Sequence, residues 1–439
     1  MITDRRFRNR RLLSAFVGIV FVLSMLGNPL AALAAGWSPE VTIFPLMQST
    51  APNAFAINPS GNEVWVTASL ANFTMTVTAA QRTFGGAWSS PTTIASVRAT
   101  SLPLTVALSA NNYAAAAWQD AIALRSPAGV WQAPVHLGLT GSVSNFQVML
   151  DAQGNGVAVW GRLTNTNTVV EAVTWTANGN FGSVVQLSPS SHGAFGPQLA
   201  INDAGTAVVV WLASAPLDNG NPYQVESVTR PAGGNWSAVT TASPVVPQTW
   251  APEVALDGSG NATAIWMTAT TLASEHLYAA TRPAGGAWGS PTQIEPSAWR
   301  ALSQTSMAAD AAGNFTVSWV GQDQSGVNNV RTATLPAGGA WGAPTTLGQC
   351  QIVSSYCLVQ VSAAHDGSIA VVGWGAYPPA RGNNVAVRLG SGAWVPMAVG
   401  NNSPQLSFVL ATNNAHASVV WRAAIGVRYK VDLRQSDYR

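Results

Sequence analysis

Residues 150–160 read LDAQGNGVAVW, residues 256–266 read LDGSGNATAIW and residues 309–319 read ADAAGNFTVSW. In each stretch an Asp is followed three residues later by Gly-Asn, and small and apolar residues then alternate up to a Trp. Gly and Asn tolerate positive φ, so each stretch predicts a hairpin turn whose second strand ends on the Trp. Looser copies of this hairpin unit begin at Ile57 and span Leu108–Trp118, Ile201–Trp211, Ala363–Trp374 and Ala411–Trp421.

A second unit, Pro-Ala-Gly-Gly-x-Trp, alternates with the first along the chain. Its clearest copies end at Trp236, Trp288 and Trp341, and its relatives end at Trp88, Trp131, Phe181 and Trp394. The glycines of the hairpin units lie 42 to 55 residues apart, and each repeat divides into four short strands. Repeated four-stranded units with a Trp signature are typical of a β-propeller. The sequence therefore predicts an all-β fold, a single β-propeller of about eight four-stranded blades that leaves no room for a second domain.

The two ends of this repeat region match different strands of the unit. Residues 36–43 resemble the fourth strand, and residues 426–433 resemble the third. We therefore expect Trp37–Phe44 to be the outer strand of the last blade, so that the N-terminal strand closes the ring. Pairing with this N-terminal strand would cover the third strand of the last blade, and the ring would then leave only the short outer edges of its blades. We expect a monomer.

The hairpin unit resembles a degenerate form of the Asp-box repeat of sialidase-type propellers, over nearly all of residues 35–439. The usual box is Ser-x-Asp-x-Gly-x-Thr-Trp, whereas here Asp151 lies three residues before Gly154 and Trp160 lies six after it. The resemblance implies a propeller fold in which the boxes are structural. The sialidase set of three arginines, a Tyr–Glu pair and an Asp cannot be matched to residues of this chain.

Arginines recur near the second Trp of each repeat. A ligand site needs residues from unlike positions, so recurrence at one blade position predicts blade-to-blade structural contacts instead. The recurring residues are Arg82, Arg125, Arg230, Arg282, Arg388 and Arg434.

The N-terminal segment has the order of a secretory signal peptide. Five arginines within residues 5–11 precede an apolar run, Leu12–Met25, and the small residues 31–35 follow. We expect residues 1–34 to be removed on export to the periplasm or the extracellular space, leaving residues 35–439 as the propeller. The alternative is an uncleaved membrane anchor, because the apolar run is long.

Charge and cysteine content narrow the possible partners. Only 9% of residues are charged, and residues 35–439 hold 15 Lys and Arg against 17 Asp and Glu, with Lys430 the single lysine. Nothing in this pattern supports binding of nucleic acid through its phosphates. Cys350 and Cys357, the only cysteines, are predicted to form a disulfide in an exported protein.

The innermost strand of each repeat predicts a polar ring in the central channel. Counting back from the Asp position, the odd places hold apolar residues, and the fourth place back holds Thr105, Gln147, Gln198, Glu253, Ser306 and Gln360. Glu253 is the only charge in this ring. It is either a ligand-contacting group or a general acid with a raised pKa, or else a solvated channel residue bonded to Gln198, Ser306 or water.

Off-pattern aromatic and charged residues gather in the loops at the same end of the channel. They include His192, Asp218, Tyr223, Trp250, Glu275, His276, Trp299, Arg300, Asp323, Tyr377 and Arg381. Aromatic faces beside polar groups suit sugars or peptides. The candidate ligand-binding set is Glu253, Trp250, Trp299, Arg300, Gln198, Gln147, Ser306 and Gln360; alternatively, the two tryptophans cap their blades.

These patterns favour an exported binding module for a glycan or a cell-surface protein. A glycosidase is the alternative enzyme, and it would need two carboxylates about 5–10 Å apart, for which only Glu253 with Asp218 or Glu275 qualifies. A structural envelope protein is the third possibility. The sequence predicts no cofactor and no metal; calcium at the hairpins is disfavoured because each offers one carboxylate at best.

Overall fold

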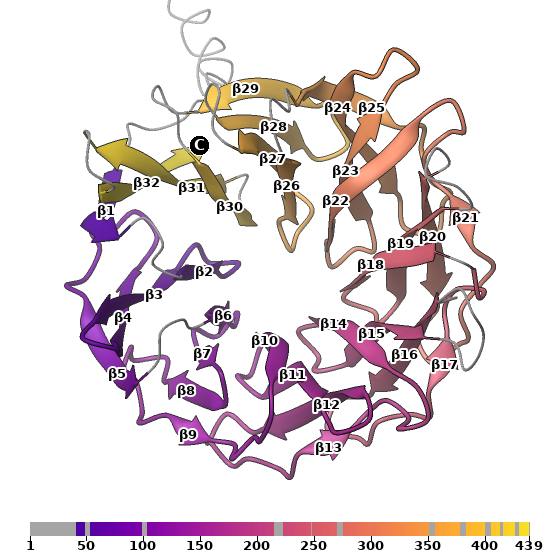
Figure 1. Cartoon of the computed structure of the whole chain (residues 1–439). Helices are drawn as coiled ribbons and strands as arrows, with labels where there is room; N and C mark the ends of the chain where they lie inside the picture. Colours follow the sequence, from indigo (N-terminus) through magenta and orange to yellow (C-terminus); the bar gives the residue numbers. More distant parts are fainter. Residues whose placement is uncertain are drawn as a thin grey trace, which may run out of the picture.

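A computed structural model describes residues 41–48, 53–98, 103–214, 223–246, 248–269, 275–350, 356–377, 383–399, 405–412, 416–425 and 430–438. All regular elements in these ranges are β-strands, arranged in four-stranded antiparallel sheets around a central axis (Figure 1). The predicted signal peptide, its cleavage site and Asp218 lie outside the described residues.

Seven blades are each built from four consecutive strands, with the first strand innermost. Blade 1 contains β2 (Asn53–Ile57), β3 (Glu63–Ala71), β4 (Thr74–Arg82) and β5 (Thr92–Arg98). Blade 2 contains β6 (Thr105–Leu108), β7 (Ala114–Trp118), β8 (Ala121–Arg125) and β9 (Val135–His136). Blade 3 contains β10 (Val143–Leu150), β11 (Gly156–Leu163), β12 (Thr168–Trp175) and β13 (Val185–Gln186). Blade 4 contains β14 (Ala194–Ile201), β15 (Ala207–Ser214), β16 (Tyr223–Arg230) and β17 (Thr240–Thr241). Blade 5 contains β18 (Gln248–Leu256), β19 (Ala262–Ala269), β20 (Glu275–Arg282) and β21 (Thr292–Gln293). Blade 6 contains β22 (Arg300–Ala309), β23 (Phe315–Gln322), β24 (Asn328–Leu335) and β25 (Thr345–Gln349). Blade 7 contains β26 (Tyr356–Ala363), β27 (Ile369–Tyr377), β28 (Asn383–Leu389) and β29 (Val395–Val399).

The count of self-contained blades is therefore seven rather than the predicted eight. The last repeat supplies only β30 (Gln405–Thr412), β31 (His416–Ile425) and β32 (Lys430–Tyr438). The fourth position of this composite sheet is taken by β1 (Val41–Gln48), which pairs with β32 and begins four residues later than the strand expected at Trp37. Closure of the ring through this pairing remains a proposal.

The hydrophobic core lies between the blades, because side chains of a strand alternate between the two neighbouring blades. Val157 and Val159 of β11 pack in one cluster with blade 4, whereas Ala158 and Trp160 of the same strand pack in another with blade 2. The second strands are consequently buried on both faces, as all five residues of β7 are. This explains the small and apolar runs that precede each Trp.

The first Trp of each blade fills the interface with the preceding blade. Trp160, Trp211 and Trp319 are fully buried, and each donates its indole N–H to a buried carboxylate. These acceptors are Glu171 and Glu226 on the third strands and Glu295 in the connection from blade 5 to blade 6. The sequence pattern did not reveal these carboxylates.

The Asp-x-x-Gly-Asn turns satisfy their own polar groups. The Asp257 carboxylate accepts hydrogen bonds from the backbone of Ser259 and from both the backbone and the side chain of Asn261, at 2.7–2.9 Å. The side chain of Asn261 in turn accepts the N–H of Ala284 at 3.0 Å, which joins the hairpin unit to the second unit of the same blade. Among the described residues no cluster of three or more His, Cys, Asp or Glu side chains could hold a metal.

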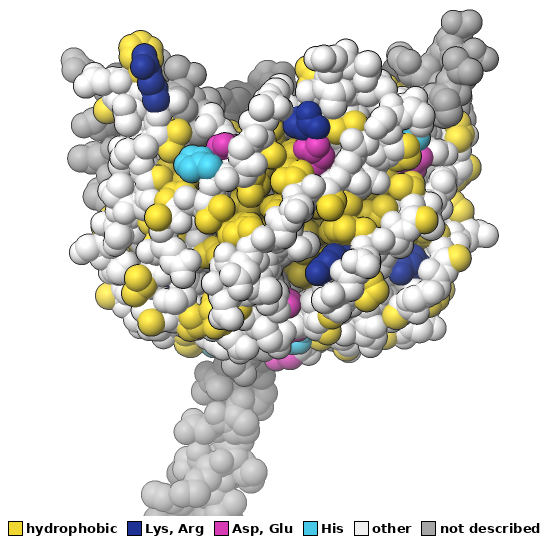
Figure 2. Space-filling view, turned by 90° about the horizontal axis from the view of Figure 1, so that it is seen from below, with side chains coloured by type: hydrophobic (Ala, Val, Ile, Leu, Met, Phe, Trp, Pro, Cys, Tyr) yellow, Lys and Arg dark blue, Asp and Glu magenta, His cyan; other side chains and the backbone are white. Residues whose placement is uncertain are grey.

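The predicted disulfide between Cys350 and Cys357 is confirmed, with a Cα–Cα distance of 6.2 Å. It joins the end of blade 6 to β26 of blade 7, and both cysteines are buried among apolar residues. No helix in the described part of the chain is long and apolar enough to cross a membrane. Figure 2 shows a side of the ring on which the few charged side chains are surrounded by uncharged polar and apolar ones.

Candidate functional site

The polar ring predicted on the innermost strands ties neighbouring blades together. The side-chain oxygen of Gln147 accepts the N–H of Leu199 in the next blade at 2.9 Å, and Ser306 accepts the N–H of Val361 at 3.0 Å. Gln147 also donates to Gln198 at 2.9 Å. The same repeat position therefore supplies a cross-blade hydrogen bond at several interfaces, which gives these residues a structural role whether or not they also contact a ligand.

Glu253 makes the equivalent contact between blades 5 and 6, with a charged group. Its carboxylate accepts the N–H of Met307 and the hydroxyl proton of Thr305, the latter at 2.5 Å. Burial raises the pKa of Glu253 to about 7, and the two hydrogen bonds oppose that rise only in part. Glu253 is thus bonded to blade 6 through Thr305 and Met307 rather than through the expected Gln198 or Ser306. Contact with a ligand, or action as a general acid, stays a prediction.

A β-bulge precedes the ring position in blades 3 to 6. The pairing register shifts there in all four blades, and the residues within the shift include Asn145, Gly196, Ala251 and Gln304, whose φ values are 50°, 58°, 50° and 93°. Positive φ at Ala and Gln is unusual because Cβ crowds the backbone. Only Gly196 gives a sequence signal for this feature, so the sequence did not predict it.

Trp250 and Trp299 both pack against blade 6. The half-buried Trp250 packs against the apolar cluster between blades 5 and 6. The Arg331 guanidinium carbon lies 3.9 Å from the centre of the Trp299 ring, and Arg331 pairs with the buried Glu295 at 3.2 Å. These contacts are those of blade caps, the alternative role that the sequence left open, while binding of a ligand by the two tryptophans stays a prediction.

Glu275 forms an ion pair at a position distant from Glu253. Its carboxylate pairs with Arg300 at 2.6 Å, joining blade 5 to blade 6. Glu253 lies opposite Ile265, which lies opposite Ala279, four residues from Glu275. With strands about 4.8 Å apart and a rise of about 3.4 Å per residue, the two backbone positions are about 16 Å apart. This separation does not favour a pair of glycosidase carboxylates.

The recurring arginines contact the preceding blade at one shared position. Arg125 donates to the Gln81 side chain, Arg282 to Thr229 at 2.5 Å, and Arg388 to Thr334 at 2.6 Å. These bonds confirm the predicted blade-to-blade role at three interfaces. Two of the recurring arginines, Arg82 and Arg388, also lie over the second Trp of their own blade.

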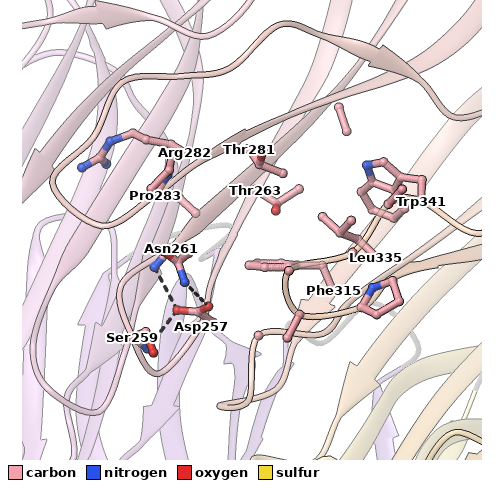
Figure 3. Close-up of a pocket in the computed structure, with 18 of the residues that line it drawn as sticks. Asp257, Ser259, Asn261, Thr263, Thr281, Arg282, Pro283, Phe315, Leu335 and Trp341 are labelled. Carbon is pink, nitrogen blue, oxygen red and sulfur yellow. Dashed lines mark hydrogen bonds between the residues drawn. The ribbon is translucent and has the colours of Figure 1, made fainter.

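A cavity of about 500 Å³ opens between blades 5 and 6, where this contact is missing (Figure 3). Phe315, Leu335 and Trp341 of blade 6 form an apolar wall, and Thr263 and Thr281 of blade 5 lie across from it. Two charged residues, Asp257 and Arg282, lie at the far edge. Their charges are opposite in sign, and they already bond to Ser259 and Asn261 and to Gly286 and Thr229, respectively, so the lining carries no net charge.

Three departures from the repeat create the cavity. Leu335 stands where blades 1, 2, 4 and 5 have Arg, and Phe315 stands opposite it where blades 2, 4 and 5 have Ala. At the preceding interface the Trp288 indole donates to Ser227 at 2.7 Å, but the residue equivalent to Ser227 in blade 5 is Ala279. Two cross-blade hydrogen bonds are therefore replaced by an open space with an aromatic wall.

An unpartnered polar group remains at this cavity. The buried hydroxyl of Thr263 has no hydrogen-bond partner, although Thr263 is fully enclosed. Figure 3 shows the Trp341 indole nitrogen on the side of the ring that faces the threonines. A buried polar group without a partner is unfavourable, so a ligand or a water that bonds to it is stabilised there.

The sequence contains a signal for this site in a departure from the repeat. Residues 229–236 read TRPAGGNW and residues 281–288 read TRPAGGAW, whereas residues 334–341 read TLPAGGAW. The repeat pattern was defined by residues that recur. It therefore did not draw attention to blade 6, where Leu335 replaces the Arg of the two preceding copies. Such a departure marks a position that the structural role of the repeat does not explain.

Comparisons with known proteins support the fold. No family model matches the chain, so the Asp-box resemblance has no support at the family level, and no curated protein matches it. The structure is similar to that of the BP39L lectin from Burkholderia pseudomallei, with a TM-score of 0.53 and 15% identity over 80% of this chain and 100% of that chain. A polysaccharide lyase of the PL25 ulvan lyase family (TM-score 0.48, 11% identity, 83% and 97% covered) and the Hadza microbial sialidase Hz136 (0.40, 11%, 74% and 73%) are more distant. At these identities the likeness shows the propeller fold alone.

Proposed function

We propose that this chain is an exported carbohydrate-binding protein that holds a neutral sugar in the cavity between blades 5 and 6. The observation that carries the proposal is the pairing of an apolar aromatic wall, Phe315 and Trp341, with the unpartnered hydroxyl of Thr263 opposite. A sugar ring has apolar C–H faces and a rim of hydroxyls, and both find matching groups in this cavity. The structural neighbour from Burkholderia pseudomallei is a lectin, which agrees with this class of ligand.

Removal of the Trp341 indole tests the proposal. We expect Trp341→Ala to abolish retention on the glycans of an array that the wild type recognises, because the variant loses both the stacking face and a donor. Trp288→Ala is the matched control, since Trp288 occupies the same repeat position one blade earlier and lies outside the cavity lining. If both variants lose binding equally, or if Trp341→Ala binds like the wild type, the cavity is not the sugar site.

A second ligand region at the channel mouth remains a proposal, supported by the recurrent bulges that place Trp250 and Glu253 at the inner rim. The double variant Trp250→Ala/Trp299→Ala distinguishes it from the blade 5/6 cavity, because only the channel-mouth hypothesis expects lost binding with Trp341 intact. If the wild type hydrolyses a glycoside and Glu253→Gln does not, the result would instead support the glycosidase alternative.

Closure of the ring by β1 is proposed on the basis of its pairing with β32 and of the contact between β30 and β2. Deleting residues 35–46 should leave β32 as a free sheet edge and lower solubility and the melting temperature. Unchanged melting and solubility would argue for an open ring. Export is tested separately, by N-terminal sequencing of the secreted protein, which we expect to begin at Ala35.

A further inference from the structure

A second cavity, of about 320 Å³, lies between blades 1 and 2, and its charge differs from that of the blade 5/6 cavity. Its lining contains Arg82 and Arg125 together with Asn62, Gln81 and Ser89, and no acidic side chain. The two cavities share no residue. A ligand of the blade 1/2 cavity is therefore independent of the neutral sugar proposed for the blade 5/6 cavity.

The two arginines in this lining differ in how their charges are balanced. Arg82 forms an ion pair with the buried Glu63, whose carboxylate also accepts the Ser418 hydroxyl at 2.9 Å. Arg125 donates only to neutral groups, the side chain of Gln81 and, at 2.9 Å, the backbone oxygen of Asn112. No carboxylate of the described residues lies within 4.0 Å of its guanidinium, although Arg125 is only 4% exposed.

A buried cation without a counter-charge is unfavourable. Burial lowers the pKa of Arg125 to about 10, in the direction that desolvation without an anionic partner requires. Arg388, at the equivalent position of blade 7, has the charge of Asp310 as a partial counterweight. An anion in the blade 1/2 cavity would supply the negative charge that no nearby side chain of the described residues provides.

We propose that the cavity between blades 1 and 2 binds an oxyanion, a carboxylate or a sulfate group carried by a sugar. Arg125 provides the charge, and the amides and hydroxyls of the lining, such as those of Asn62 and Ser89, provide neutral donors. A guanidinium binds planar carboxylates and sulfates through paired N–H donors, and a charge-assisted bond inside a cavity is stronger than one at an open surface.

The test titrates the full mature protein with sodium sulfate, sodium glucuronate and glucose by isothermal titration calorimetry, with sodium chloride at matched ionic strength as the reference. We expect saturable binding of sulfate, glucuronate or both, and none of glucose through this cavity. The sulfate and glucuronate arms identify which oxyanion the site prefers. Absence of binding by both anions beyond the chloride reference would overturn the proposal.

Three variants locate the site. Arg125→Gln removes the charge, and Ala87→Asp adds a competing carboxylate at an exposed lining position while leaving the bonds of Arg125 intact. Each should weaken anion binding by at least about tenfold, the loss expected for a hydrogen bond to a charged group. Arg388→Gln, the matched control, should bind like the wild type. Ala87→Asp keeps the test valid if Arg125→Gln does not fold, and equal binding by wild type and Ala87→Asp would contradict the site.

Discussion

The interface between blades 4 and 5 and the interface between blades 5 and 6 have the same backbone and different chemistry. At the first, Arg282 bonds to Thr229 and Trp288 bonds to Ser227, so polar groups of the two blades satisfy one another. At the second, Leu335 and Ala279 remove both bonds, and Phe315 lines the space that opens. A repeat can thus keep its architecture in most copies while one interface lacks the cross-blade hydrogen bonds and contains a cavity.

The largest effect is expected from restoring the repeat at the blade 5/6 interface. The triple variant Ala279→Ser/Phe315→Ala/Leu335→Arg gives this interface the residues of its neighbour, so the new guanidinium and hydroxyl should occupy the cavity. We expect sugar binding to be abolished in a protein that retains its circular dichroism spectrum. Retention of binding by the folded triple variant would show that the departures from the repeat do not make the site.

A second difference between the interfaces lies at the polar ring, where blade 4 has Gln198 and blade 5 has Glu253. The folded-state pKa of Glu253, about 7, lies above the usual 4.5, so the folded protein binds a proton that the unfolded chain has released. Stability should therefore fall as pH rises from about 4.5 to 7 and level off above, by about 1–3 kcal/mol. Burial also raises the pKa of Glu295 to about 7, so Glu295 contributes a decline in the same pH range. Glu253→Gln should therefore reduce this decline without abolishing it, and should be more stable than the wild type at pH 8. Urea unfolding at pH 5 and pH 8 measures both, and equal pH dependence in the two proteins would contradict the assignment.

Removal of a single hydroxyl should weaken the interface between blades 4 and 5. Ser227→Ala leaves the Trp288 indole N–H without its acceptor and should lower the free energy of unfolding by about 1–2 kcal/mol. A double-mutant cycle with Trp288→Phe isolates this bond, because Ser227→Ala should have little effect once the indole is gone. Additive losses in the cycle would mean that the bond does not stabilise the interface.

The smallest effect on stability is expected from a substitution in the cavity between blades 5 and 6. Thr263→Val removes a buried hydroxyl that has no partner, so the free energy of unfolding should stay within about 1 kcal/mol of the wild type or rise. Affinity for the sugar should nevertheless fall if that hydroxyl bonds to the ligand. A marked loss of stability in Thr263→Val, measured by urea unfolding, would indicate that the hydroxyl has a bonded partner in solution.

The blade architecture was predictable from the amino-acid sequence alone. The spacing of the two Trp units predicted four strands in each repeat. The alternation before Asp151, Asp257 and Asp310 predicted which side chains face the neighbouring blades, and the two cysteines predicted the disulfide. These features follow from local periodicity and from a repeat that reports the same environment many times. The expected blade-to-blade contacts of the recurring arginines are confirmed for Arg125, Arg282 and Arg388.

The positions of the cavities and the balance of the buried charges depend on how the blades pack. A pocket between blades depends on pairs such as Thr229 with Arg282, which are 53 residues apart and meet only when two blades pack. The roles of Glu253 and Arg125 depend likewise on burial and on partners from the adjacent blade. Composition shows that a charge is present, but its pKa and its need for a counter-ion are set by the groups that folding brings within hydrogen-bonding distance.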